Sequence, residues 1–291
     1  MSAVRSHHIA CDGVWLHVVE EGQGSPVLVL HGFTGSSDSM AGVGAALRDH
    51  HRVLRVDLLG HGRSDAPRDH APYGIERCAA QLVGVLDAFS MPYAHVVGYS
   101  MGGRVALALA ALHPSRVASV LGIGARAGLE DPAERAARVR DDELLAARIE
   151  REGVSAFVDA WMALPLFATQ RRLGAAALAA ARDERLANRP HALTASLRAM
   201  GAGAQTPLHA RLAQLSMPVL LIAGAEDAGF AAIARDLARR LLHGRVSLVP
   251  EAGHAAHLEN PEAFAQIARA FLAAADAATG LDDSPLKEAH V

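Results

Sequence analysis

A serine enclosed by glycines is the first candidate for chemistry in this sequence. The segment "HVVGYSMGGRVALALAALHP", residues 95–114, places Ser100 in a G-x-S-x-G pattern between a short apolar run and a long run of alanine and leucine. Gly98 and Gly102 leave room for a sharp strand-to-helix turn that presents the hydroxyl above a sheet. A serine can also simply cap a helix, but the flanking glycines favour a reactive hydroxyl.

A serine hydroxyl becomes reactive when a neighbouring group takes its proton, so a histidine and an orienting carboxylate are needed. Asp227 follows the apolar run "PVLLIAG", and His254 follows the run "RVSLVP". The order serine, aspartate, histidine is that of the α/β-hydrolase fold. Glu226 and His257 lie beside these residues and remain alternatives for the two roles.

Two backbone N–H groups are candidates for stabilising negative charge on a substrate oxygen. In "LHGFTGSS" an apolar run ends at His31 and Gly32, so the N–H of Phe33 can point inward. The N–H of Met101 lies at the start of the helix that follows the serine, where backbone donors are free to bind anions. An ordinary glycine turn is the alternative, but we expect Phe33 and Met101 to form an oxyanion hole.

Short apolar runs must position these groups. They span residues 26–32, 52–60, 95–100, 117–124, 218–224 and 245–250 and alternate with helical segments. Runs this short and this apolar are typical of central parallel strands. The predicted fold class is α/β: a mostly parallel sheet flanked by helices, with a helical lid inserted.

The alternation of strands and helices stops in one long segment. Residues 126–210 are rich in arginine and show helical patterns without a strand, so we interpret them as a lid over the carboxyl edge of the sheet. Residues 1–125 and 211–275 would then form the core. Residues 276–291 have little apolar content and are expected to form a flexible tail.

Composition narrows the class of function. The chain has 291 residues, of which 51% are hydrophobic, and a net charge of −3 without a basic block, so nothing favours binding to nucleic acid.

The apolar runs are shorter than the roughly 20 residues that a membrane-spanning helix needs. With two cysteines and no signal-peptide core, we expect a cytoplasmic protein without a membrane partner. The histidines lack metal-ligand spacing, so no metal is expected, and the oligomeric state is left open.

Several motifs resemble those of a known superfamily. The segments "HGFTGSS", "DLLGHGRSD", "GYSMGGRVAL", "AGAED" and "AGHAAHLENP" look like the α/β-hydrolase superfamily from about residue 12 to 275. The segments "GYSMGGR", "GLEDPAERAARVRDDE", "FVDAWMALPLFA" and "RLANRPHALTASLRAMGAGAQ" resemble the 2-succinyl-6-hydroxy-2,4-cyclohexadiene-1-carboxylate synthase family of menaquinone biosynthesis.

This resemblance implies a carbon–oxygen lyase that needs no cofactor. The family eliminates pyruvate from 2-succinyl-5-enolpyruvyl-6-hydroxy-3-cyclohexene-1-carboxylate. On this reading Ser100, polarised by His254 and held by Asp227, acts as a base and forms no acyl-enzyme. By position in the matched motifs, Arg138 and Arg185 would bind carboxylates.

The residues themselves also point to a small polycarboxylate substrate. Arg104 lies four positions after Ser100, on the same helix face and among apolar residues, where an arginine without a partner is costly. An internal ion pair is the alternative. The resemblance further implies, by position in the matched motifs, that Tyr99 and Trp161 line the pocket. The alternatives are that Trp161 is a core anchor beneath the lid and that Arg135 or Arg140 takes the place of Arg138.

Two other classes of function fit the same residues. A serine carboxylesterase or carbon–carbon bond hydrolase would use Ser100 as a nucleophile. A non-catalytic receptor would keep the pocket alone, but the intact triad speaks against it. Brisk turnover of an aryl ester would favour the hydrolase, and release of pyruvate would favour the lyase.

Overall fold

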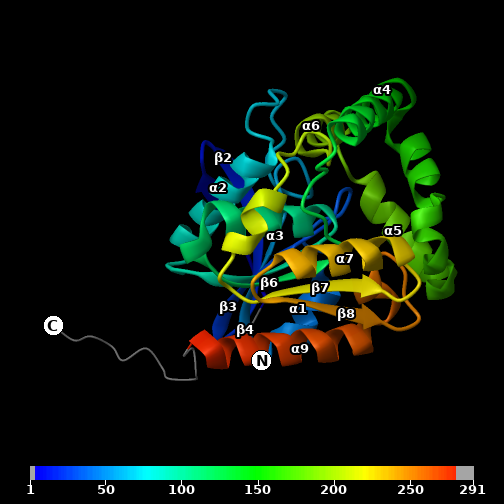
Figure 1. The fold of residues 1–291 in the computed structure, drawn as a ribbon. Coiled ribbons are helices and arrows are strands. Elements are labelled where there is room, and N and C mark those ends of the chain that lie inside the picture. The colour runs from blue at the N-terminus through cyan, green and yellow to red at the C-terminus, as the bar shows by residue number, and fades with distance from the viewer. Residues whose placement is uncertain (1–3, 280–291) are drawn as a thin grey trace.

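An eight-stranded sheet forms the centre of the computed structural model, which describes residues 4–279. Its strands are β1 (Arg5–Cys11), β2 (Val14–Gly22), β3 (Ser25–Leu30), β4 (His51–Val56), β5 (Ala94–Tyr99), β6 (Val117–Ile123), β7 (Val219–Gly224) and β8 (Gly244–Val249). They lie in the order β1-β2-β4-β3-β5-β6-β7-β8. Figure 1 shows β7 and β8 side by side at one side of the sheet. Only the pairs β1/β2 and β2/β4 of this sheet are antiparallel, so the predicted mostly parallel sheet is confirmed.

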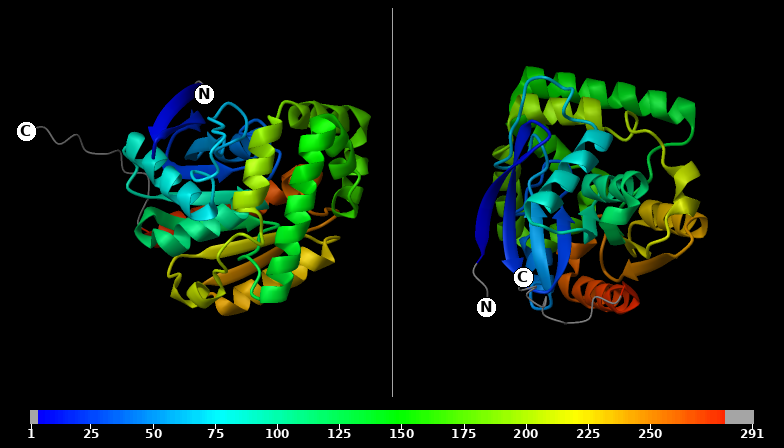
Figure 2. Two further views of the ribbon diagram at one scale, coloured as in Figure 1. Left: turned by 90° about the horizontal axis from the view of Figure 1, so that it is seen from above. Right: turned by 90° about the vertical axis from the view of Figure 1, so that its left-hand side faces the viewer.

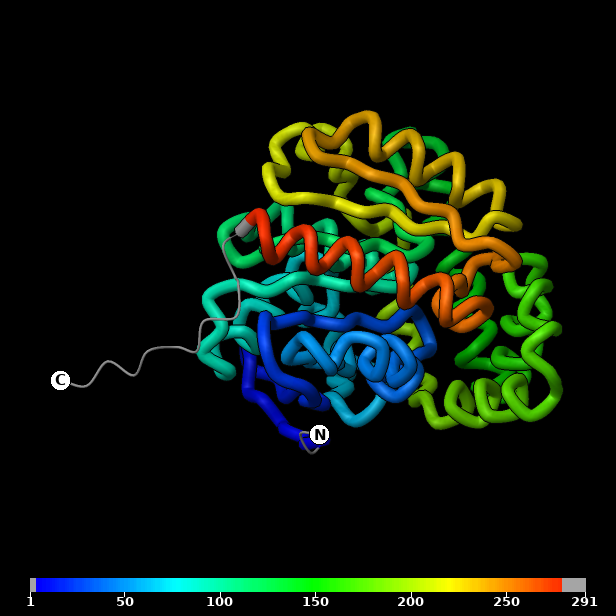
Figure 3. The backbone as a smooth tube through the Cα atoms, turned by 90° about the horizontal axis from the view of Figure 1, so that it is seen from below, coloured from blue at the N-terminus to red at the C-terminus, as the bar shows by residue number. Residues whose placement is uncertain are grey.

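Helices cover both faces of the sheet. One face carries α2 (Ile75–Ala88), α3 (Met101–Leu112) and α7 (Ala228–Arg240), and the other carries α1 (Ala41–Leu47), the short α8 (Ala256–Glu259) and α9 (Pro261–Thr279) (Figures 1 and 3). The short 3-10 helices η1 (Pro114–Arg116) and η3 (His209–Gln214) lie in connections to β6 and β7.

Successive residues of a central strand enter different cores. In β3, Leu28 and Leu30 pack with α2 and α3, whereas Val27 and Val29 pack with α1 and α9. All four side chains are fully buried, and each such burial contributes about 1.5–3 kcal/mol. This is the physical reason that the predicted strands are apolar at almost every position.

The N-terminal hairpin of β1 and β2 was not predicted from the sequence. Much of β1 is exposed, and its polar residues hide it from a search for apolar runs. Asp12 and Gly13 join the two strands with φ angles of 50° and 78°. An Asp-Gly pair with two positive φ values is favoured in tight hairpins, so this dipeptide was the available signal.

The lid consists of helices that lie within residues 126–210. They are α4 (Pro132–Met162), η2 (Pro165–Leu173), α5 (Gly174–Leu186) and α6 (Pro190–Met200), and α4 packs beside α6 (Figure 2). The carboxylate of Asp131 caps α4 by accepting a hydrogen bond from the N–H of Glu134 at 2.8 Å. The lid has its own small apolar cluster, which includes Ile149, Phe157 and Leu193.

A bend divides α4 into two helical halves. Gly153 has φ 80° and ψ 174°, values far from those of a helix. This region of backbone conformation is accessible essentially to glycine alone. Trp161 lies in the second half of α4, after the bend.

The expected tail boundary is too early. Helix α9 continues to Thr279, and the carboxylate of Asp276 accepts a hydrogen bond from the Ser25 hydroxyl at 3.0 Å and lies 2.9 Å from Nε2 of His95. Residue 276 therefore belongs to the core. The remainder of the expected tail, residues 280–291, lies outside the described residues.

No helix in residues 4–279 combines the length and the apolar character needed to cross a membrane.

Candidate active site

Ser100 occupies the turn between β5 and α3 with a φ of 50°. Its N–H donates to the carbonyl oxygen of Ile123 at 2.8 Å, which ties the turn to β6. A Cβ atom at Gly98 would collide with the backbone of Gly102. The glycines are therefore required for the start of α3 to approach the edge of the sheet, where it presents the hydroxyl.

His254 joins the other two members of the predicted triad. Its Nε2 lies 3.2 Å from Oγ of Ser100, and its Nδ1 lies 3.0 Å from Oδ2 of Asp227. Asp227 also caps α7, because its Oδ1 accepts a hydrogen bond from the N–H of Phe230 at 3.1 Å. This chain of contacts can pass a proton from the serine to the imidazole.

The carboxylate of Asp227 is held in its charged form. Burial opposes the charge, but the hydrogen bonds with His254 and with the N–H of Phe230 outweigh burial and lower the pKa of Asp227. An ionised carboxylate at this position orients the imidazole and stabilises its protonated form.

The two alternative residues lie outside this arrangement. Glu226 forms an exposed ion pair with Arg172 at 2.7 Å. His257 is buried with its ring 4.6 Å from the ring of Tyr99, and burial lowers its pKa to about 3. His257 is therefore neutral near pH 7, and neither residue contacts Ser100.

The N–H groups of Phe33 and Met101 have no hydrogen-bond acceptor within residues 4–279. Both residues line the same cavity as Ser100. His31 holds the loop of Phe33, since its Nε2 accepts from the N–H of Leu58 at 3.0 Å and its Nδ1 donates to the carbonyl of Gly32 at 2.7 Å. Two free donors beside a reactive hydroxyl are the arrangement that stabilises an oxyanion.

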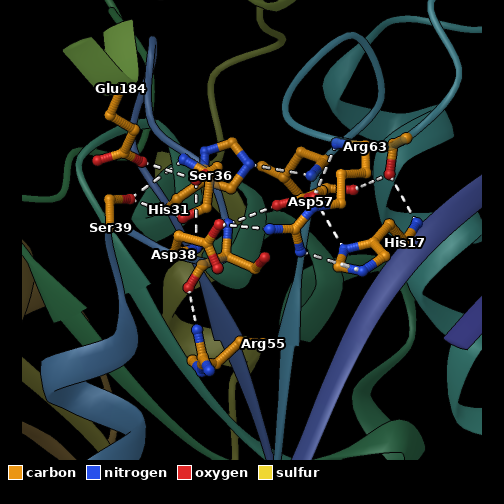
Figure 4. A network of polar contacts seen from close by, with 12 residues as sticks. His17, His31, Ser36, Asp38, Ser39, Arg55, Asp57, Arg63 and Glu184 are labelled. Atoms are coloured by element: carbon orange, nitrogen blue, oxygen red, sulfur yellow. Dashed lines mark hydrogen bonds and ion pairs between the residues drawn. The ribbon is translucent and has the colours of Figure 1, made fainter. Parts of the chain in front are cut away.

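A buried polar network braces this loop. Asp57 accepts hydrogen bonds from the N–H groups of Ser37 and Arg63 and lies 2.9 Å from Nδ1 of His17 (Figure 4). From the lid, Glu184 accepts a hydrogen bond from the Ser36 hydroxyl at 2.6 Å (Figure 4). The loop that carries the oxyanion candidate is thus fixed to the core and to α5.

A cavity of about 400 Å³ lies between the sheet edge and the lid. Ser100 and His254 line it together with all five predicted pocket residues, Tyr99, Arg104, Arg138, Trp161 and Arg185. The ring of Trp161 packs 5.4 Å from that of Phe33 and 5.8 Å from that of Phe167. Trp161 therefore both anchors the lid and forms a wall of the cavity.

The Arg104 side chain is buried in the cavity wall without a carboxylate partner. Its Nη1 donates to the carbonyl of Met200 at 2.6 Å and to Oε1 of Gln205 at 3.1 Å. No carboxylate of residues 4–279 lies within ion-pair distance, so the alternative of an internal ion pair is not observed. Burial lowers the pKa of Arg104 to about 10, which leaves the guanidinium charged near pH 7.

The lid arginines differ in what they contact. Arg138 lines the cavity with its Nε 2.8 Å from Oδ1 of Asp142, whereas Arg135 and Arg140 are absent from the cavity lining. Arg185 donates from Nη1 to the carbonyl of Ala181 at 2.7 Å. Its buried Nε has no acceptor in the described part of the chain.

Among the arginines that line the cavity, sequence reasoning missed one, Arg126. It follows β6 in "GIGARAG" and lines the cavity beside the predicted arginines. The available signal was its position after a central strand, because ligands of α/β proteins bind at the carboxyl ends of the strands. The described residues contain no cluster of three or more His, Cys, Asp or Glu side chains that could hold a metal ion.

Comparisons with known proteins show which family the chain belongs to. A model of the α/β-hydrolase fold family matches residues 25–261. The chain belongs to the α/β-hydrolase fold family. The predicted fold class, including the sheet with helices on both faces, is thereby confirmed.

Individual members of this family are similar over most of their length. A Bacillus subtilis (strain 168) protein, provisionally named 2-succinyl-6-hydroxy-2,4-cyclohexadiene-1-carboxylate synthase, is 38% identical over 263 residues, covering 90% of this chain and 96% of that protein. The synthase of this name from Enterobacter sp. (strain 638) is 36% identical over 243 residues, covering 83% and 90%. The solved structure of MenH from S. aureus superposes with a TM-score of 0.85 at 27% identity, covering 90% and 98%. The predicted resemblance to this synthase family is confirmed.

Proposed function

We propose that this α/β-hydrolase-fold enzyme eliminates pyruvate from 2-succinyl-5-enolpyruvyl-6-hydroxy-3-cyclohexene-1-carboxylate, as a lyase of menaquinone biosynthesis. The observation that carries the proposal is the set of arginines around the cavity above Ser100. The substrate has carboxylates on its ring, its succinyl group and its enolpyruvyl group. Guanidinium groups bind carboxylates through paired hydrogen bonds, which suits a molecule with three such groups.

Proton abstraction begins the proposed reaction. Oγ of Ser100 takes the proton from the ring carbon beside the succinyl carbonyl, while its own proton passes to Nε2 of His254. The electron pair of the broken C–H bond forms a new C=C bond, and the ring double bond shifts. The C–O bond to the enolpyruvyl group then breaks. The released enolpyruvate takes up a proton on carbon from solvent and becomes pyruvate, and His254 returns its extra proton to solvent.

The neighbouring groups lower the energy of this step. The negative charge that develops on the succinyl carbonyl oxygen faces the free N–H groups of Phe33 and Met101. The ionised carboxylate of Asp227 stabilises the imidazolium of His254. The proposed scheme uses groups of this chain alone and calls for no cofactor. We also propose that the enzyme is cytoplasmic and that its substrate is a small polycarboxylate, as the sequence led us to expect.

A serine carboxylesterase or carbon–carbon bond hydrolase is the alternative. The 3.2 Å contact between Ser100 and His254 also fits a nucleophile that attacks a carbonyl. An acyl-enzyme would then form, and water would release it. The arginine-lined cavity favours the lyase, because a simple ester offers no carboxylate to bind those side chains.

Pyruvate release tests the proposal. Purified protein is mixed with the enolpyruvyl substrate, and pyruvate is followed by its reduction with lactate dehydrogenase and NADH. We expect saturable pyruvate formation that Ser100→Ala abolishes. Fast saturable turnover of a p-nitrophenyl ester without pyruvate formation would establish the hydrolase instead. Tight binding of the substrate without any conversion would establish a receptor.

A further inference from the structure

The position of Arg126 follows from the turn that ends β6. Gly124 has φ 55°, and a Cβ atom at this position would lie 2.8 Å from Cε1 of His254. The turn therefore passes directly against the histidine of the triad. Two residues later, Arg126 lines the cavity.

The side chain of Arg126 has no acceptor among the described residues, 4–279. No hydrogen bond or ion pair joins it to any residue of 4–279, and its Nε is buried. Burial lowers the pKa of Arg126, and the nearby charge of Arg138 lowers it further. A buried N–H that has lost its water without gaining an acceptor is costly, and a ligand is one means by which such a group is satisfied.

Other arginines of the lid are bound differently. Arg172, Arg182 and Arg198 each place two nitrogens on the carboxylate of a glutamate or aspartate. These pairs are on the exposed surface of the lid. The lid thus supplies carboxylates to its outer arginines but none to Arg126 in the cavity.

Arg126 lies near two further cations. The charges of Arg126 and Arg138 both act on Arg104, so three guanidinium groups from α3, the β6–α4 connection and α4 lie near one part of the cavity. Asp142 lies 2.8 Å from Arg138, and its charge also acts on Arg104. Glu134, whose charge acts on Arg126, is exposed to water, which screens it.

We propose that Arg126, together with Arg104, binds a carboxylate of the substrate and thereby determines specificity for a polycarboxylate. This inference rests on the proposed function for the identity of the substrate. The carboxylate bound by Arg126 does not itself react, so the contribution of Arg126 is the same in the ground state and in the transition state. Loss of such uniform binding raises KM and leaves kcat nearly unchanged.

The test compares Arg126→Gln with Arg140→Gln. Arg140 is an exposed arginine on α4 that does not line the cavity, so it controls for loss of one positive charge from the lid. In the pyruvate assay we expect Arg126→Gln to raise KM about tenfold, the effect of one charge-assisted hydrogen bond, with kcat close to that of the wild type. We expect Arg140→Gln to leave both constants unchanged.

Calorimetric titration with propane-1,2,3-tricarboxylate gives a second readout that needs no reaction. We expect its Kd to rise about tenfold in Arg126→Gln and to stay unchanged in Arg140→Gln. Arg126→Met, which keeps most of the side-chain volume, replaces the glutamine variant if circular dichroism shows that the latter does not fold.

The two readouts separate the inference from the proposed function. Pyruvate release by the wild type, with equal KM and equal Kd in the Arg126 and Arg140 variants, overturns the inference and leaves the proposed function standing. If the wild type releases no pyruvate but Arg126→Gln still weakens binding of the tricarboxylate, the function fails and the carboxylate site stands. Failure of the wild type to bind this probe, together with an unchanged KM, also overturns the inference.

Discussion

The backbone N–H of Arg104 donates to the carbonyl oxygen of Ser100 at 3.1 Å, so the reactive hydroxyl and a buried cation occupy successive turns of α3. This bond belongs to the first turn of a helix that is buried along most of its length. The spacing between Ser100, the proposed base, and Arg104, the proposed carboxylate-binding residue, is therefore set by one rigid element, which is what precise positioning of a substrate requires.

Replacement of Arg104 should weaken catalysis strongly. We expect Arg104→Gln to lower kcat/KM about 10- to 100-fold, because a charged hydrogen-bond donor to the substrate is lost. Arg104→Lys should fall between this variant and the wild type, since an ammonium keeps the charge but not the planar fork. Arg148, an exposed arginine that pairs with Glu152, provides the control variant Arg148→Gln. Steady-state pyruvate assays measure the effect, and equal activity of the Arg104 and Arg148 variants would contradict it.

Asp227 and Glu226 should differ sharply although they are adjacent. Asp227→Asn removes the charge that orients His254, and we expect kcat to fall about 100- to 10,000-fold. Glu226→Gln removes only the exposed pair with Arg172 and should leave kcat unchanged. The same pyruvate assay compares the two variants. A large loss in Glu226→Gln with an active Asp227→Asn would mean that Glu226, and not Asp227, orients the histidine.

The bend in α4 should depend on its glycine. Gly153→Ala places a Cβ at φ 80°, which costs about 1–3 kcal/mol even though nothing crowds the site. Gly42→Ala is the matched control, because Gly42 lies in helix α1 with no atom within 4 Å of an added Cβ. It should be neutral or stabilise by up to about 1 kcal/mol.

Urea unfolding measures both glycine variants. We also expect Gly153→Ala to lower kcat/KM, since the bend positions Trp161 over the cavity. Equal unfolding free energies of the two variants would show that the bend does not depend on a glycine at position 153.

Buried neutral histidines should make the protein sensitive to acid. Burial lowers the pKa of His61 and of His257 to about 3, from an ordinary value of 6.5. As the pH falls, both imidazoles are protonated in the unfolded chain at a higher pH than in the folded protein. Their contribution to the unfolding free energy is therefore fully present above pH 6.5 and is lost as the pH falls from 6.5 toward 3. Each contributes a loss of about 1.4 kcal/mol per pH unit within that window.

His257→Leu isolates one of these contributions. Nδ1 of His257 has no hydrogen-bond partner in residues 4–279, so leucine removes the titration without breaking a bond at that atom. Urea unfolding at pH 6.5, 6.0 and 5.5 should show a shallower decline of the unfolding free energy in the variant than in the wild type. Parallel declines would mean that this histidine does not stay neutral in the folded protein.

Much of the fold could be predicted because its determinants are local. Each predicted apolar run overlaps one of the strands β3 to β8. A strand that is buried on both faces, as β6 and β7 are, must be apolar at nearly every position. The turn at Ser100 was also visible, because the backbone conformation there excludes a side chain at Gly98. The hairpin of β1 and β2 was missed because one of its strands lies at the exposed sheet edge.

The sequence by itself determined which residue types could react and in what order they follow the strands: Ser100, Asp227 and His254. The tertiary structure decided which neighbours share their cavity. Asp227 faces the histidine while Glu226 faces solvent, and Arg126 and Arg138 enter the cavity while Arg140 does not. The physical reason is that a strand or a tight turn is specified by consecutive residues. The direction of a lid side chain depends on how helices from distant segments pack over the sheet.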